Sequence, residues 1–359
     1  MITLPIFILI LSALILVHEF GHFFAARKVG VRVEKFSMGF GPQLWKRKKG
    51  DTEYSIAAIP LGGFVKLAGD NLEEFTGKPD EYYSKTLGER FQIIFLGPAL
   101  NYVLGFLVFW LIFFAGYPTL TTKVGGLLDG MGAKESGLQT GDKITAIDGK
   151  QVFYWDDMQA LIRSKKNQDS LKISVSRSGK ELEFNVRIRE KQVDDQMGAK
   201  RKVGLIGITP YDEIVKVRHG FFISSWLGLR QTWELTRITY LGLWRMITGK
   251  LSVRESVTGP LGIFYITGKA ASFGIIAVLH LVAILSVSLG LFNLLPLPIL
   301  DGGHIFLLGV EKLRGRGLSA KTETIITRVG IYMFVCLAVF VTYNDIVRLF
   351  GDKIQRFFK

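Results

Sequence analysis

Residues 1–24 form an apolar segment with one acidic residue, no Lys or Arg, and the pattern His-Glu-x-x-His. The segment is long enough for a helix that crosses a bilayer, which takes about 20 apolar residues. Residues four apart lie on the same face of a helix, so His18 and His22 can share one Zn²⁺. Glu19 stands beside the first histidine, where a general base must lie to take a proton from a metal-bound water. Ionisable groups at membrane depth are costly, so the segment predicts a metal centre within the membrane.

Two other interpretations of this segment need to be considered. A cleavable signal peptide has a basic start and a small-residue cleavage site, and neither is present, so we expect a first membrane span. A satisfied polar cluster between packed helices is the alternative to a metal site. Zinc needs a third protein ligand, which the rest of the chain must supply.

Composition agrees with a membrane protein that carries a substantial soluble part. Hydrophobic residues make up 48% of the 359 residues, and the mean hydropathy is +0.29. Lys and Arg exceed Asp and Glu by 45 − 31 = 14, and these cations gather beside the apolar segments. That placement favours an orientation signal and anionic lipid headgroups, and no nucleic-acid partner is expected. The single cysteine, Cys336, excludes an intramolecular disulfide and a cysteine-based metal site, and we expect it to be buried in its apolar run.

The segment after the first span is basic and rich in glycine. Arg27, Lys28 and the run at 46–49 make it a cytoplasmic loop by the positive-inside rule, with the metal motif toward the cytoplasmic end of its helix. Glycines among aromatic and β-branched residues predict a hairpin that folds back toward the membrane. Gly62 and Gly63 could then offer backbone groups to an extended substrate. An ordinary cytoplasmic hairpin is the alternative.

A second span is predicted from about residue 93 to 117, and a polar domain follows it. Asn101 is a polar residue inside the span, so we expect it to hydrogen bond to a neighbouring helix or to the hairpin. Residues 118–192 contain the run Gly-Leu-Gln-Thr-Gly-Asp-Lys-Ile before Ile-Asp-Gly, which resembles a bacterial, protease-associated PDZ domain. Gly125 and Gly126 would lie in its peptide groove. An empty groove that only filters substrates by size is the alternative.

The remaining chain completes the predicted metal site. Residues 221–247 carry charges and three tryptophans, which favours an interfacial amphipathic helix over a fifth span. A clean span follows from residue 274 and ends at two prolines, which break the helix just before Asp301. Asp301 is therefore the predicted third zinc ligand, and His304 is its rival. A last span is predicted at 325–350; alternation places the C-terminus outside, whereas its basic residues favour the cytoplasm.

Together these motifs resemble the site-2 protease family of intramembrane zinc metalloproteases, in its bacterial RseP-like branch. The shared motifs are His-Glu-Phe-Gly-His, Gly-Phe-Gly-Pro, Pro-Leu-Gly-Gly-Phe-Val-Lys and Asn-Leu-Leu-Pro-Leu-Pro-Ile-Leu-Asp-Gly-Gly-His. The resemblance implies that His18, His22 and Asp301 bind zinc, that Glu19 is the base, and that Asn293 engages the substrate. It also implies that the amphipathic segment gates access. Enteric members that regulate sigma-E carry two PDZ domains, whereas this chain has room for one.

We therefore predict a polytopic α-helical membrane protein with about four transmembrane helices, a membrane-associated β-hairpin loop and one inserted α+β PDZ domain. The predicted activity is zinc-dependent cleavage of single-span membrane proteins, such as an anti-sigma factor or a remnant signal peptide. The predicted location is the bacterial cytoplasmic membrane, with the active site toward the cytoplasm and the PDZ domain outside. A non-catalytic PDZ scaffold is the main alternative; a zinc transporter would need more ionisable residues along its spans. The predicted parts are 1–117 (first two spans and β-loop), 118–192 (PDZ), 193–273 (connector and amphipathic helices) and 274–359 (last two spans).

Overall fold

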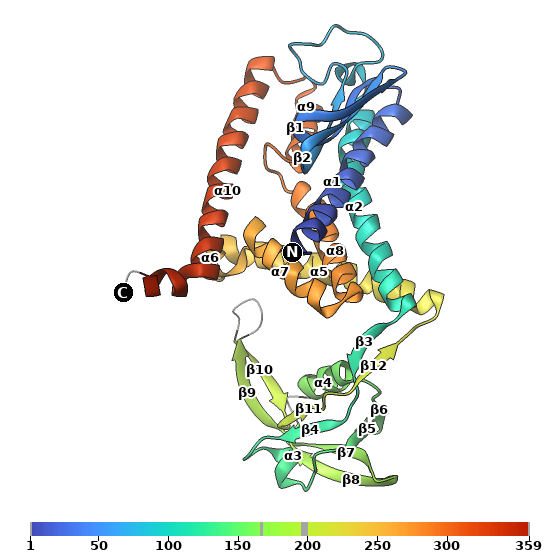
Figure 1. The fold of residues 1–359 in the computed structure, drawn as a ribbon, viewed down its shortest axis with the longest axis vertical. Helices are drawn as coiled ribbons and strands as arrows, with labels where there is room; N and C mark the ends of the chain where they lie inside the picture. Colours follow the sequence, from blue (N-terminus) through green and yellow to red (C-terminus); the bar gives the residue numbers. More distant parts are fainter. Residues whose placement is uncertain (1, 166–167, 195–199, 358–359) are drawn as a thin grey trace. The chain divides into compact units, whose positions relative to one another are not determined.

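The computed structural model describes residues 2–165, 168–194 and 200–357, which divide into two compact units (Figure 1). One unit comprises Met1–Ile112, Phe222–Leu241 and Ser252–Lys359, and the other comprises Phe113–Phe221 and Gly242–Leu251. The helices and strands of the first unit are α1 (Thr3–Lys28), β1 (Val33–Lys49), β2 (Thr52–Leu67), the 3₁₀ helix η1 (Tyr82–Ser84), most of α2 (Leu87–Ala115), most of α5 (Phe221–Ile247), α6 (Val253–Ser256), α7 (Pro260–Phe273), α8 (Ile275–Asn293), α9 (Asp301–Arg314) and α10 (Ala320–Phe357).

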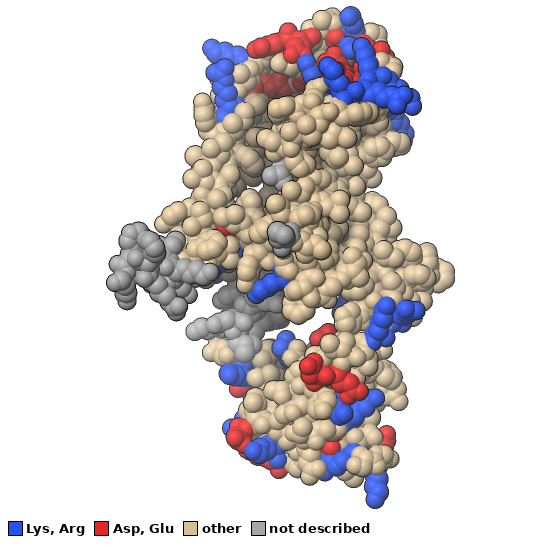
Figure 2. Space-filling view, in the orientation of Figure 1, with Lys and Arg blue, Asp and Glu red and all other residues tan. Residues whose placement is uncertain are grey.

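Four helices are long and apolar enough to cross a membrane: α1, α2, α8 and the first 31 residues of α10. At about 1.5 Å per residue, even the 19 residues of α8 reach about 29 Å, close to the thickness of a hydrocarbon core. In Figure 2 the charged side chains of this unit gather at the end that holds β1 and β2, and a largely uncharged band lies below them. The prediction of about four membrane spans is confirmed.

The outer surface of α10 contradicts one prediction. This helix packs mainly against α7, and its span carries many exposed apolar side chains, including Val329 and Val339. Cys336 lies on the same span and is exposed, so the expectation of a buried thiol was wrong. The apolar run around Cys336 is suited to lipid contact rather than to a protein core.

The loop after α1 folds into the predicted β-hairpin sheet. Residues 35–38 of β1 pair with residues 63–66 of β2 on one side and with residues 53–56 on the other. The stretch 63–67 therefore has a strand partner on one side only within the described chain, and β2 contacts α1. This places an edge strand beside the helix that carries the His-Glu-x-x-His motif.

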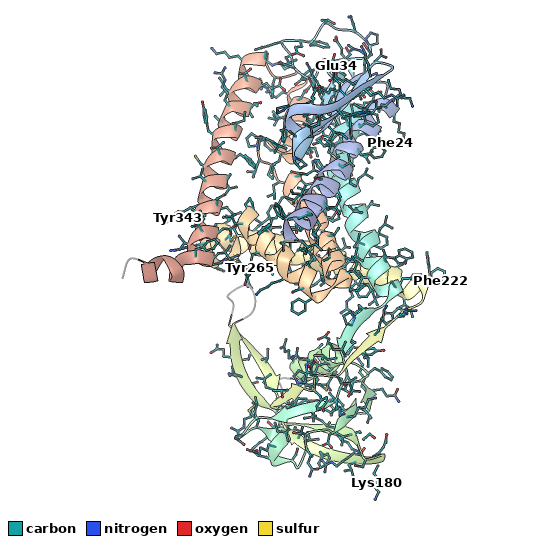
Figure 3. The ribbon with its side chains drawn as sticks, viewed as in Figure 1. Phe24, Glu34, Lys180, Phe222, Tyr265 and Tyr343 are labelled. Carbon is teal, nitrogen blue, oxygen red and sulfur yellow. The ribbon has the colours of Figure 1, made fainter. Side chains whose placement is uncertain are left out.

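The helix α5 carries large apolar side chains and charged side chains on its exposed surface. Phe222 is 84% exposed and projects outward at its start (Figure 3), and Trp226 and Trp233 are also exposed. On the same helix Arg237 forms an ion pair with Glu234. Among the described helices α5 is not one of the four candidate spans, and its position at the membrane interface stays a prediction.

The second unit is built on a four-stranded sheet in the order β6-β5-β7-β8. Its core includes fully buried apolar side chains from β5, α4 and β7, among them Ile144, Met158 and Ile173. Three further antiparallel pairs join β3 to β12, β4 to β11 and β9 to β10. The elements of this unit are β3 (Tyr117–Leu120), β4 (Val124–Leu127), α3 (Gly132–Glu135), β5 (Lys143–Ile147), β6 (Lys150–Gln151), α4 (Trp155–Ser164), β7 (Ser170–Arg177), β8 (Lys180–Arg187), β9 (Arg189–Asp194), β10 (Lys200–Leu205), β11 (Ile208–Pro210) and β12 (Ile214–Val217).

The extent of this unit differs from the predicted range 118–192. Strands β11 and β12 lie beyond residue 192, yet they pair with β4 and β3 at the start of the unit. The segment predicted as a connector therefore contributes strands to the same β-rich unit. The partners of these strands, β4 and β3, lie at the start of the unit, far from β11 and β12 in sequence. A local sequence pattern cannot indicate such a pairing.

Candidate active site

The two histidines of α1 lie one helical turn apart and face the same point. Their ring centroids are 4.8 Å apart, and the two Nε2 atoms are 3.2 Å apart. His18 is buried and His22 is half-buried. The spacing of four residues thus produces the shared face that the sequence predicted.

Asp301 reaches the same point from the other end of the chain. Helix α8 ends at Asn293, and Pro296 and Pro298 lie in the irregular segment before α9 begins at Asp301. Glycines 302 and 303 pack so tightly against the backbone of that segment that an added Cβ would lie 2.2 and 2.1 Å from its carbonyl oxygens. This close packing holds Asp301 at the broken helix end.

The three side chains form a set of donors that fits zinc. Asp301 Oδ2 lies 3.1 Å from His18 Nε2, and Asp301 Oδ1 lies 3.6 Å from His22 Nε2. Two atoms that are each about 2.1 Å from a tetrahedral ion are about 3.4 Å apart, close to these separations. Asp301 Oδ2 is also buried without a hydrogen-bond partner, as a metal ligand would be. Two histidines and one carboxylate, with a fourth position open, are the donors of a catalytic zinc site.

The rival ligand His304 lies outside this cluster. Among the described residues, only His18, His22 and Asp301 form a group of three or more potential ligands close enough to hold one metal ion. His304 instead lines a cavity of about 220 Å³ together with Arg90 and Glu311, which form an ion pair. The structure therefore favours Asp301, as the sequence did.

One face of α2 supports both histidines. The Ile93 carbonyl oxygen lies 2.9 Å from His22 Nδ1, and the Asn101 side chain lies 3.3 Å from His18 Nδ1. Between them, Gly97 lies against the His22 ring, and an added Cβ there would be 2.3 Å from Nε2. The sequence indicates a hydrogen-bonding role for Asn101 but none for Ile93 and Gly97. Ile93, Gly97 and Asn101 are each four residues apart, and this spacing is the sequence signal that they share one face of the helix.

Glu19 lies between the metal cluster and the edge strand of β2. An added Cβ at Gly63 would lie 3.3 Å from its Cγ, so the strand passes close to this side chain. On the same helix Ser12 donates a hydrogen bond to the Pro60 carbonyl oxygen at 2.7 Å. The carboxylate thus lies between the histidines and a strand whose outer edge has no strand partner in the described chain.

The remaining predicted residues fall into three environments. The Asn293 amide lies 3.4 Å from His18 Nε2, at the metal cluster. Gly62 has a φ of 140° and lies against the Phe40 ring, so Gly63 rather than Gly62 approaches Glu19. The predicted groove glycines at 125 and 126 lie in the other unit, within β4. An added Cβ would lie 2.1 Å from an atom of β11 at Gly125 and 2.7 Å from one at Gly126. Strand β4 is therefore already paired with β11 within the unit.

Comparisons with known proteins agree with this chemistry. The model of peptidase family M50 matches residues 6–337. A protein of Agrobacterium fabrum named as a zinc metalloprotease is 34% identical over 365 residues, covering 96% of both chains. One so named from Campylobacter jejuni is 32% identical and covers 96% of this chain and 93% of its own. The regulator of sigma-E protease RseP of Escherichia coli is 29% identical, with coverage of 96% and 98%.

A solved structure is also similar in sequence to part of this chain. The PDZ domain of an SdrC-like protein from Listeria monocytogenes is 29% identical over 25% of this chain and 86% of its own, with a TM-score of 0.21.

Proposed function

The chain belongs to peptidase family M50 and is an intramembrane zinc metalloprotease. On that premise we propose that His18, His22 and Asp301 hold its zinc ion and that Glu19 transfers the proton of the attacking water. The observation that carries this assignment is the convergence of three ligand side chains, from α1 and α9, within 4.8 Å of one another. The buried Asp301 oxygen without a partner supports it further. A bound zinc ion polarises a carbonyl group and makes water a better nucleophile.

Glu19 is the general base in this proposal. Its carboxylate takes a proton from the attacking water and then delivers it to the nitrogen of the departing amine. It neighbours both histidines in sequence and in space, and it lies beside the edge of β2, where the cleaved peptide would run.

We assign substrate positioning to Asn293, Gly63 and Gly62. A helical substrate hides its carbonyl groups in intrahelical hydrogen bonds, so it must be extended before cleavage. The open edge at 63–67 can add such a segment as a further strand, and the absence of a side chain at Gly63 lets this edge lie close to Glu19. The Asn293 amide, beside His18, can hydrogen bond to the substrate backbone near the reacting carbonyl.

The proposed substrates are single-span membrane proteins, either an anti-sigma factor or remnant signal peptides. Support comes from the four candidate spans of the chain and from the similarity to a protein named as a sigma-E regulator. The PDZ-like unit would receive a peptide or the soluble part of a substrate. Gly125 and Gly126 stay a prediction for that contact, although β4 is engaged with β11 in this region.

We further propose that the protein lies in the bacterial cytoplasmic membrane with its active site toward the cytoplasm. Arg27 and Lys28 at the end of α1, and the basic stretch of β1, support this orientation by the positive-inside rule. The PDZ-like unit, connected through α2, would then lie on the opposite side. Membrane lipid would contact the exposed apolar surfaces of the spans.

A single pair of variants tests the catalytic assignment. Glu19→Gln should bind zinc with wild-type stoichiometry and cleave a single-span reporter at least about 100-fold more slowly, because the proton acceptor is lost. Glu183→Gln is the matched control, since this carboxylate of β8 pairs with Lys172 of β7, in the unit that does not carry the proposed zinc ligands. Cleavage by Glu19→Gln at the wild-type rate would refute the assignment.

A further inference from the structure

Asn101 is a fully buried amide that contacts a zinc ligand and is incompletely paired. Its exposed fraction is 0%, and its Nδ2 lies 3.3 Å from His18 Nδ1. Its Oδ1 has no hydrogen-bond partner. Leaving a buried oxygen unpaired costs about 1–3 kcal/mol, so this arrangement needs an explanation.

The protonation of His18 supplies that explanation. The Nε2 atom of His18 faces His22 and Asp301, so it is the nitrogen that binds zinc. A neutral imidazole that binds metal through Nε2 carries its proton on Nδ1, which makes Nδ1 a donor. The Asn101 NH₂ group is also a donor, so two donors face each other across 3.3 Å.

Exchanging the two ends of the amide replaces the contact between two donors with a hydrogen bond. The two ends of an Asn amide have nearly the same shape, and hydrogen bonding decides which end is which. After the exchange Oδ1 accepts the proton of His18 Nδ1 and is no longer unpaired. The residue itself stays in place because its backbone oxygen accepts a 2.8 Å hydrogen bond from Ser286 of α8.

The other histidine has a matching partner on the same helix. His22 Nδ1 lies 2.9 Å from the Ile93 carbonyl oxygen, an acceptor that cannot act as a donor. Ile93 and Asn101 are two steps of four residues apart on α2, so they lie on one face, each opposite one histidine. A metal-binding histidine usually donates its second N–H in this way, which fixes the orientation of its ring.

We propose that Asn101 is a positioning residue that accepts the Nδ1 proton of His18 and so holds Nε2 toward the zinc ion. This inference rests on the proposed ligand set of His18, His22 and Asp301. Loss of such a partner typically weakens metal binding by about 10- to 100-fold. A purely structural hydrogen bond between helices would leave metal affinity unchanged once the protein has folded.

The test is a zinc competition titration of the purified full-length protein in detergent. Asn101→Leu keeps the branched shape of the side chain and removes the acceptor, so zinc affinity should fall about 10- to 100-fold. Asn101→Asp keeps an acceptor and should remain within about threefold of wild type. Asn344→Leu is the matched control: Asn344 is a buried asparagine of α10 that bonds to the Arg254 carbonyl oxygen, and its loss should not change zinc affinity.

Two spectroscopic measurements extend the test. With Co²⁺ in place of zinc, Asn101→Leu should shift the visible absorption bands because the His18 ring reorients. In wild-type protein labelled with ¹⁵N-histidine, both zinc-bound rings should carry their proton on Nδ1, and this measurement needs no variant to fold.

The outcomes separate this inference from the ligand assignment on which it rests. Wild-type zinc affinity in Asn101→Leu, or an equal loss in Asn101→Asp, would overturn the role of Asn101. A zinc-bound ring protonated on Nε2 would overturn it as well. Wild-type affinity in Asp301→Asn would instead overturn the proposed ligand set.

Discussion

Replacing Gly97 with alanine tests whether the close approach of α1 and α2 sets the position of a zinc ligand. A Cβ at residue 97 would lie 2.3 Å from His22 Nε2 and 2.4 Å from Cε1. Ordinary contacts between such atoms are about 3.5 Å, so the ring or the helix must move by about 1 Å. Overpacking of this kind costs about 1–3 kcal/mol. If His22 moves, that energy is taken from metal binding, and zinc affinity should fall about 5- to 150-fold.

Two glycines of the same helix provide controls for this experiment. An added Cβ at Gly88 meets nothing, so Gly88→Ala should leave zinc affinity unchanged. An added Cβ at Gly105 would lie 2.5 Å from a Val287 side-chain atom, so Gly105→Ala disturbs the packing of α2 on α8 without touching a ligand. Zinc affinity is measured in all three variants by competition with a chelator of known affinity.

The comparison of these variants decides the interpretation. If Gly97→Ala binds zinc as the wild-type protein does, the tight contact does not position His22. If Gly105→Ala loses as much affinity as Gly97→Ala, helix packing in general controls the site, and the specific contact with His22 is not responsible. The expected result is a loss in Gly97→Ala alone.

Three further outcomes are expected. Removing zinc with a chelator should abolish cleavage of a single-span reporter, and adding zinc back should restore it; activity that survives complete zinc removal would contradict a zinc enzyme. His304→Gln should retain zinc and activity because this side chain lies outside the ligand cluster, and zinc loss in this variant would favour it over Asp301 as the ligand. Burial opposes ionisation of Asp142, but two hydrogen bonds from Arg177 outweigh it and lower the Asp142 pKa below its ordinary value of 3.8. A carboxyl group whose pKa is lower in the folded than in the unfolded protein stabilises the fold at a pH above its unfolded pKa, and this stabilisation is lost as the pH falls through its folded pKa. Hydrogen-exchange protection of β5 and β7 in the full chain should therefore drop more steeply below about pH 4 in wild type than in Arg177→Leu. Equal pH profiles in the two proteins would contradict this.

Much of the site followed from local sequence patterns. The spacing of His18 and His22 determines a shared helical face, whatever the rest of the fold. The prolines before Asp301 break the helix, so the sequence predicts that this acidic residue lies at a broken helix end within the membrane. The sheet of β1 and β2 was likewise visible from glycines among aromatic residues.

The remaining features depend on contacts between distant segments. Gly97 is ordinary in sequence, and only the packing of α2 on α1 places it against the His22 ring. The strands β11 and β12 looked like a connector because their partners, β4 and β3, lie at the start of the unit, far from them in sequence. Cys336 was expected inside a core because an apolar run does not distinguish a surface facing lipid from one facing protein.

The division of the proposed metal ligands between α1 and α9 has a consequence for synthesis. The chain is made from its N-terminus, so His18, Glu19 and His22 emerge long before Asp301 does. Until α9 has been made and packed, the chain has two ligands and no complete centre. The nascent protease is therefore inert while most of its own membrane segments are being inserted, and it becomes competent only when synthesis has passed Asp301 and the last span is about to follow.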